Sequence, residues 1–236
     1  DCNNLWEQTE KIIGNYRDYF GFSVSINDNN TFAVGATANS TAANPGDGSG
    51  NVTIFSYSRE HDRSILIDSS VNILDPSSND GIPTNNLFGY SVFIDNYVLL
   101  VGSPKYGIVD ASGRAYLYDF NQSTPVLVQE FIAPVGSKYF GSSVSASINN
   151  SDYNIVVIGA GGGPFLNGNT LLESIPGGVY IYKTNTLSLT INSNPFTLVQ
   201  TIDGAASSNF GCSVSISNFT LLAGASRGAG NNSEGE

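Results

Sequence analysis

The chain has 236 residues and a net charge of −11, and 40% of its residues are hydrophobic while only 12% are charged. This composition is sufficient for a folded core. Nine Lys and Arg against 20 Asp and Glu argue against a nucleic-acid or anionic-membrane partner, and no run approaches the roughly 18 apolar residues of a membrane-spanning helix. The absence of Met and the start at Asp1 predict a processed segment of a secreted protein.

Repeated elements divide the chain into units. Four copies of Phe-Gly-x-Ser-Val begin at Phe20, Phe88, Phe140 and Phe210, which gives periods of 68, 52 and 70 residues. Period-2 alternation and β-branched residues predict four strands in each unit. In chain order we expect strands at 20–26, 32–36, 50–55, 64–67, 88–94, 98–103, 113–118, 126–131, 140–146, 155–160, 178–182, 196–202, 210–216 and 221–225. No helical pattern competes with them.

The first strand of a unit has one bulky and one small face. Phe20, Phe22, Val24 and Ile26 alternate with Gly21, Ser23 and Ser25. Radially stacked blades would place the bulky face of one blade on the small face of its neighbour. The sequence therefore predicts an all-β fold, a β-propeller of four-stranded antiparallel blades. A β-sandwich would explain the alternation, but it would not explain four matched copies.

The units resemble FG-GAP repeats, the blades of the integrin α-chain propeller and of many secreted proteins. The resemblance extends from Leu5 to about Ser226 and rests on the four Phe-Gly pairs and on the Gly-Ala or Gly-Ser pairs at 35–36, 102–103, 159–160 and 224–225. It implies a seven-bladed ring, of which residues 1–236 would form about three and a half blades of one incomplete propeller. Residues 5–12 are expected to form an isolated outer strand. Either sequence beyond this segment or another chain would complete the ring, and we favour the first.

Calcium is expected in many integrin-type blades, where an Asp-x-Asp/Asn-x-Asp-Gly loop joins the first two strands. The corresponding turns of this chain hold at most one carboxylate each. We therefore expect no metal ion and no other cofactor.

Catalytic motifs are also missing. The single His, His61, lies in a charged turn and has no arrangement typical of a catalytic triad. The Gly-rich run 161–164 lacks the following helix that a phosphate site needs. Four acidic residues in connections could meet in space, although an acidic surface that favours solubility is the simpler interpretation: Asp47, Asp80, Asp110 and Glu173. We expect no enzymatic activity.

The two cysteines are not expected to pair with each other. Cys2 borders an outer strand, whereas Cys212 lies in an innermost strand, and three strand spacings exceed the reach of a disulfide. We expect Cys212 to be a small buried apolar residue. Cys2 is left to pair with sequence outside this segment.

Seven Asn-x-Ser/Thr sequons predict N-linked glycans on a secreted or cell-surface protein. They begin at Asn29, Asn39, Asn51, Asn121, Asn149, Asn218 and Asn231. Four of them, at Asn29, Asn121, Asn149 and Asn218, fall in turns between strands 1 and 2 or 3 and 4, which share one rim of a propeller. Asn39 and Asn51 fall toward the other rim.

The opposite rim carries the long loops, and loops on a rigid scaffold are where binding usually occurs. The predicted loops are 37–49, 68–86, 104–112 and 161–176, and the binding candidates are Lys105, Tyr106, Asp110 and Phe165. We expect an extracellular glycoprotein that mediates adhesion or assembly, for example as a subunit of an extracellular filament or coat. Its expected partners are other extracellular proteins or its own copies. The alternative is an accessory propeller of a secreted hydrolase whose catalytic part lies outside this segment.

Overall fold

The computed structural model describes residues 8–38, 49–59, 65–76, 86–105, 112–122, 124–148, 153–161, 176–185 and 190–227. These residues form fourteen strands and contain no α-helix. The strands make three four-stranded antiparallel sheets and one two-stranded hairpin, each in sequence order. The predicted all-β fold of four-stranded blades is therefore confirmed for the described part of the chain.

Each blade is a simple antiparallel meander. Blade 1 contains β1 (Phe20–Ile26), β2 (Thr31–Ala36), β3 (Asn51–Arg59) and β4 (Ile65–Leu74). Blade 2 contains β5 (Ser91–Asp95), β6 (Val98–Ser103), β7 (Arg114–Asp119) and β8 (Val126–Ile132). Blade 3 contains β9 (Ser143–Ser147), β10 (Asn154–Gly159), β11 (Gly178–Thr184) and β12 (Thr197–Asp203), and half-blade 4 contains β13 (Phe210–Ser217) and β14 (Thr220–Ala225).

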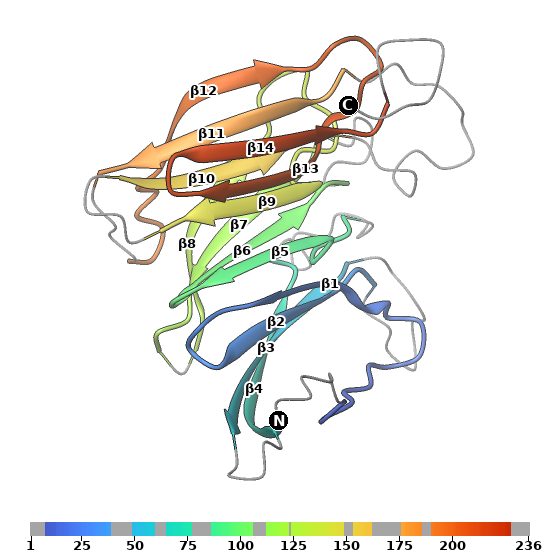
Figure 1. The fold of residues 1–236 in the computed structure, drawn as a ribbon, viewed down its shortest axis with the longest axis vertical. Coiled ribbons are helices and arrows are strands. Elements are labelled where there is room, and N and C mark those ends of the chain that lie inside the picture. Colours follow the sequence, from blue (N-terminus) through green and yellow to red (C-terminus); the bar gives the residue numbers. More distant parts are fainter. Residues whose placement is uncertain are drawn as a thin grey trace, which may run out of the picture.

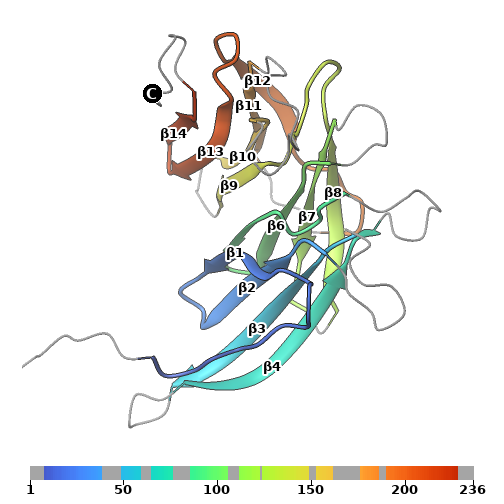
Figure 2. The same ribbon diagram turned by 90° about the vertical axis from the view of Figure 1, so that its right-hand side faces the viewer.

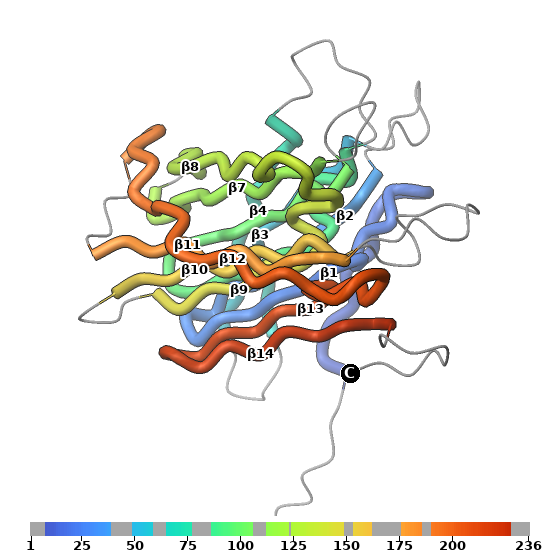
Figure 3. Tube along the Cα trace, turned by 90° about the horizontal axis from the view of Figure 1, so that it is seen from above, coloured from blue at the N-terminus to red at the C-terminus, as the bar shows by residue number. Residues whose placement is uncertain are grey.

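The sheets follow one another as an open arc (Figure 1). In the view of Figure 2, the first strands β1, β9 and β13 lie on the inner side and the fourth strands β4, β8 and β12 on the outer side. Seen from above, half-blade 4 lies at one side of the other sheets, with β14 outermost (Figure 3). The blades therefore stack through their faces, as the alternation of bulky and small residues predicts.

Two predicted elements differ from the structure. The prediction placed a long loop from Asp68, but β4 continues to Leu74 and pairs with all of β3. The expected outer strand at 5–12 is not seen in residues 8–12, which have no strand assignment, and residues 5–7 lie outside the described ranges.

The core lies between neighbouring blades. Between blades 1 and 2, Val52 and Ile54 belong to the same buried cluster as Phe88 and Ile94. Between blades 2 and 3, the bulky face of blade 3 joins buried residues of β6, β7 and β8. The outer face of blade 1, called here the head face, is covered by no described blade: Val24 is 69% and Ile26 65% exposed.

A bulge moves one residue away from the predicted pattern. The register of β1 and β2 shifts between Phe20 and Ser23, so Gly21 and Phe22 have no partner in β2. Phe22 was expected on the bulky face, but its ring lies 4.9 Å from that of Tyr90 in the next blade. Phe20, Val24 and Ile26 keep the predicted face because two residues are inserted, which preserves the alternation.

The Phe-Gly pair joins each blade to the one before it. Phe88, Phe140 and Phe210 form parallel bridges with Gly50, Gly113 and Gly177 of the preceding blade. The carbonyl of the glycine in each Phe-Gly pair contacts a Ser-Gly socket of the preceding blade. A Ser-Gly socket is defined here as the serine of strand 1 and the glycine of strand 2 that pair with each other in one blade. The four sockets are Ser23/Gly35, Ser91/Gly102, Ser143/Gly159 and Ser213/Gly224.

Three of these sockets are filled in the same way. The serine Oγ donates a hydrogen bond to the next blade's glycine carbonyl: Ser23 to Gly89 at 2.7 Å, Ser91 to Gly141 at 2.9 Å and Ser143 to Gly211 at 2.8 Å. A Cβ on the socket glycine would overlap that same carbonyl oxygen in each case. The repeated glycine is therefore required by close backbone approach between blades.

Candidate functional site

The described turns separate into two rims. The β1–β2, β5–β6 and β13–β14 turns lie together on the left of Figure 1 and are called here the turn rim, with the β7–β8 turn. The connections from strand 2 to strand 3 and from one blade to the next leave the opposite ends of the strands and are called the loop rim. The strand order thus gives the rim arrangement that the sequence predicted.

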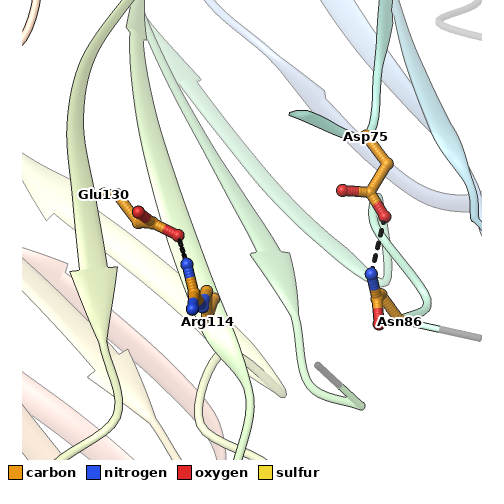
Figure 4. Close-up of polar contacts among 4 residues, drawn as sticks. All are labelled: Asp75, Asn86, Arg114 and Glu130. Carbon is orange, nitrogen blue, oxygen red and sulfur yellow. Dashed lines mark hydrogen bonds and ion pairs between the residues drawn. The ribbon is translucent and has the colours of Figure 1, made fainter. Parts of the chain in front are cut away.

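Lys105 lies on the loop rim, where binding was predicted. Its backbone N–H donates to the Asn86 carbonyl at 3.1 Å, and the Ser103 hydroxyl donates to the same oxygen at 3.0 Å. Asn86 in turn donates from Nδ2 to Asp75 Oδ2 at 3.0 Å (Figure 4). Asp75 and Asn86 are 1% and 2% exposed, so a buried polar pair holds the backbone at Lys105.

An ion pair lies on the neighbouring strands of blade 2. Arg114 at the start of β7 contacts Glu130 of β8 through Nη1 and Oε1 (Figure 4). Arg114 is also in register with Ser103 on β6, two residues before Lys105. Both side chains of the ion pair are partly exposed, so its contribution to stability is small, but it fixes a positive and a negative group at the loop-rim end of blade 2.

The turn rim carries three described sequons. Asn121 and Asn218 are exposed in the β7–β8 and β13–β14 turns, as predicted. Asn29 is also exposed, and its Nδ2, the atom that would bear a glycan, donates to Asn96 Oδ1 of blade 2 at 3.3 Å. The turn itself is held by Asn27 Oδ1, which accepts from the N–H groups of Asn29 and Thr31.

Asn51 has a different environment from the other described sequons. It is the first residue of β3 and lies in register with Ala36 and Leu74, on the head face. Asn51 therefore lies at the loop-rim end of blade 1, toward which the sequence placed it, and its register places it on the head face of that blade.

Exposed aromatic residues on the turn rim were not singled out from the sequence. Tyr153, just before β10, packs edge-on against Phe219 of the β13–β14 turn at 5.9 Å between ring centroids. The Lys183 ammonium lies 3.2 Å from the centroid of the Tyr153 ring. Tyr97 and Phe120 form a similar pair in blade 2 at 6.1 Å. The sequence signal that could have identified them is the recurrence of aromatic residues in the turns of successive blades.

Several predicted site residues lie outside the described ranges. They are the binding candidates Tyr106, Asp110 and Phe165, the sequons at Asn39, Asn149 and Asn231, the acidic residues Asp47, Asp80 and Glu173, His61, Cys2 and the run 162–164. Gly161 is described, and its N–H donates to Ser142 Oγ at 3.1 Å. A Cβ on Gly161 would overlap backbone atoms of Asn209 and Cys212, so this glycine serves the contact between blades 3 and 4.

Cys212 was expected to be buried, but it is partly exposed and free. It lies in the β13 bulge, and its thiol donates to the Gly224 carbonyl at 3.5 Å. Burial raises the pKa of Tyr90, and the nearby Cys212 raises it further. Burial also raises the pKa of Tyr182 to about 12. These tyrosines are neutral packing groups at physiological pH.

Within the described ranges, no three His, Cys, Asp or Glu side chains gather as they would around a metal ion. The same part of the chain contains no helix long and apolar enough to cross a membrane.

Repeated four-stranded blades joined face to face define a protein of the β-propeller type. A family model described as FG-GAP repeat matches residues 6–55 and 200–236. These two segments match FG-GAP repeats, so the resemblance predicted from the motifs is confirmed. Such repeats typically occur in extracellular proteins. A comparison with curated proteins finds no match.

Proposed function

We infer that the chain is a non-enzymatic, metal-free module of a secreted or cell-surface glycoprotein, and that it mediates adhesion or assembly through its loop rim. The partners are other extracellular proteins or further copies of the chain. The observation that carries this proposal is the difference between the rims: three described sequons lie on the turn rim, whereas Lys105 on the loop rim is fixed by a buried polar pair.

Binding at the loop rim is supported by the rigidity of the scaffold beneath it. Each loop leaves a blade whose neighbours are held by a filled Ser-Gly socket, so few groups lose freedom when a partner docks. The Lys105 backbone is held by a carbonyl that also accepts from Ser103. Glycans on the turn rim would leave this surface open to a protein partner.

The first test asks whether the protein is glycosylated. The chain is expressed through a eukaryotic secretory pathway, and its intact mass is measured before and after N-glycosidase treatment. We expect loss of several glycans, with glycopeptides containing Asn121 and Asn218. An unchanged mass would contradict the glycoprotein proposal.

The second test places a glycan on the proposed binding surface. The double substitution Lys105→Asn with Gly107→Ser creates a sequon at position 105, and Asn121→Gln removes one from the turn rim as a control. Beads coated with each protein are tested for adhesion to the cells that secrete it and to one another. We expect the loop-rim glycan to abolish adhesion while the control keeps it. Equal adhesion of both variants would overturn the assignment of the loop rim.

A further inference from the structure

The outer edge of β4 lies on the circumference of the arc, and β3 is the only strand that pairs with β4 in its sheet (Figure 2). Blades stack through their faces, so a further blade before or after the arc would cover a face of blade 1 and leave this edge open. The backbone N–H and C=O groups along such an edge can pair with another strand. The ten residues of β4 present these groups over about 33 Å.

Blade 2 shows how such an edge is covered inside the molecule. The segment 190–196 of blade 3 lies along β8, where the Asn192 N–H donates to the Leu127 carbonyl at 3.1 Å. The Gln129 side chain binds both the N–H and the carbonyl of Phe196 at 2.8 Å. In the described part of the chain, no corresponding backbone hydrogen bond reaches the outer edge of β4. The edge of β4 therefore differs from that of β8 although both are fourth strands.

The sequence of β4 lacks the residues that usually protect a strand edge. Asp68 is its single charged residue, and the strand contains neither Lys nor Pro. Leu66 and Leu74, near its two ends, are 55% and 52% exposed. Long edge strands with apolar residues and little charge are the ones that pair with other chains.

We propose that β4 pairs antiparallel with β4 of a second copy, about a two-fold axis at Ser70. The partner is a second copy because the strand is close to a palindrome, Ile-Leu-Ile-Asp-Ser-Ser-Val-Asn-Ile-Leu. Its register with β3 skips Asp68, which forms a bulge. With that bulge kept in both copies, Ile65 lies opposite Leu74 and Leu66 lies opposite Ile73.

The sheet faces agree with this register. The pairing with β3 places Ile65 and Leu74 on one face of the sheet and Leu66 and Ile73 on the other, so each pair meets on a common face. These pairs remove exposed apolar surface from water at both ends of the contact. The contact is isologous, so it closes as a dimer with one continuous eight-stranded sheet. It uses neither Lys105 nor the loop rim, and it can therefore fail while the proposed function holds, and the reverse.

The first test asks whether position 70 of one copy meets position 70 of the other. Ser70→Cys and the control Asn72→Cys are each combined with Cys2→Ser and Cys212→Ser, so that one thiol remains. Both positions are exposed and lie on the same face of β4. In the proposed register the two thiols at position 70 are directly opposite, whereas those at position 72 are separated by about 13 Å along the strand. After mild oxidation, we expect a disulfide-linked dimer for Ser70→Cys and a monomer for Asn72→Cys on a non-reducing gel.

The second test measures the pairing without a cross-link. Ser70→Lys places two ammonium groups directly opposite each other, whereas Asn72→Lys adds the same charge away from the two-fold axis. By sedimentation velocity at rising concentration, we expect the wild type and Asn72→Lys to form a dimer and Ser70→Lys to lose it, with equal melting temperatures for the two Lys variants.

Four results would overturn the proposal. They are no cross-link at position 70, equal cross-linking at positions 70 and 72, equal dimerisation of the two Lys variants, and a wild type that is monomeric at every concentration. The last result would leave the β4 edge to an extended segment of a different protein.

Discussion

The residue before each Phe-Gly pair has a left-handed backbone. Its φ lies between 54° and 59° in all four units, although none of these residues is glycine: Tyr19, Leu87, Tyr139 and Asn209. This conformation costs about 1–2 kcal/mol per residue. It directs the Phe N–H to the preceding blade, where Phe140 donates to Ser112 and Phe210 to Pro176. These hydrogen bonds between blades offset the conformational cost of the left-handed residue.

Asp95 gives a pH-dependent prediction. Burial raises its pKa above the ordinary 3.8 and the charge of Asp28 adds to this, while a hydrogen bond from the Asn96 backbone lowers it. Since the folded-state pKa is raised, the stability contributed by Asp95 is fully present below pH 3.8 and is lost as the pH rises through the folded-state value. We therefore expect Asp95→Asn to stabilise the protein at neutral pH and to change little in acid.

The increase in the free energy of unfolding of Asp95→Asn at neutral pH is expected to stay below about 1 kcal/mol, because solvent screens the partly exposed Asp95 carboxylate. Urea unfolding at both pH values measures it. Asp28→Asn is the matched control and should give a smaller gain of the same sign. A loss of stability for Asp95→Asn at neutral pH would contradict this explanation.

Residue positions were predictable where alternation continues without interruption. Val24, Ser23 and Ser25 lie on the faces that their spacing predicts. Phe22 does not, because a bulge depends on the positive φ of Gly21, which the hydrophobic pattern does not reveal. Burial of Cys212 was wrongly predicted for the related reason that it lies in the equivalent bulge of β13.

At the level of elements, outer strands were the hardest to predict. β4 runs through Asp68, Ser69 and Ser70, which are exposed on an edge strand and resemble loop residues in the sequence. Its pairing with the nine residues of β3 determines its length. The inner strands β6 and β10 are buried throughout, and their apolar runs were sufficient to place them.

The connection between β4 and β5 gives a second prediction. Asn86→Ala removes the donor to the buried Asp75 carboxylate, and the backbone that holds Lys105 loses its support. We expect a loss of about 3 kcal/mol, because a buried charged acceptor is left without this partner. Equilibrium urea unfolding measures this loss.

Asn72→Ala is the matched control, since exposed Asn72 only accepts a 3.4 Å hydrogen bond from Thr53. It should change the free energy of unfolding by less than about 0.5 kcal/mol. Equal losses for the two variants would show that the Asp75–Asn86 pair does not support the connection. The sequence indicated Lys105 as a binding candidate but not this pair, because both residues look like ordinary polar loop residues.

On the scale of the whole molecule, each blade contacts mainly its neighbours. The contact is a repeated joint, in which the Phe-Gly pair of one blade meets the Ser-Gly socket of the blade before it. The same motif residue therefore has a different role inside the arc and at its end. Gly102 faces the Gly141 carbonyl of blade 3, whereas Gly224 faces only Ser213 of its own half-blade. The four repeated glycines were evident in the sequence, but the backbone atom that each one meets depends on the stacking of blades.

The most direct test of this joint compares Gly102→Ala with Gly224→Ala by the free energy of unfolding in urea. The added methyl at position 102 would overlap the Gly141 carbonyl, so we expect a loss of about 3 kcal/mol. At position 224 the Ser213 hydroxyl can rotate away, and we expect a change below about 0.5 kcal/mol. Equal losses at the two positions would contradict the conclusion that the Phe-Gly pair and the Ser-Gly socket hold the blades together.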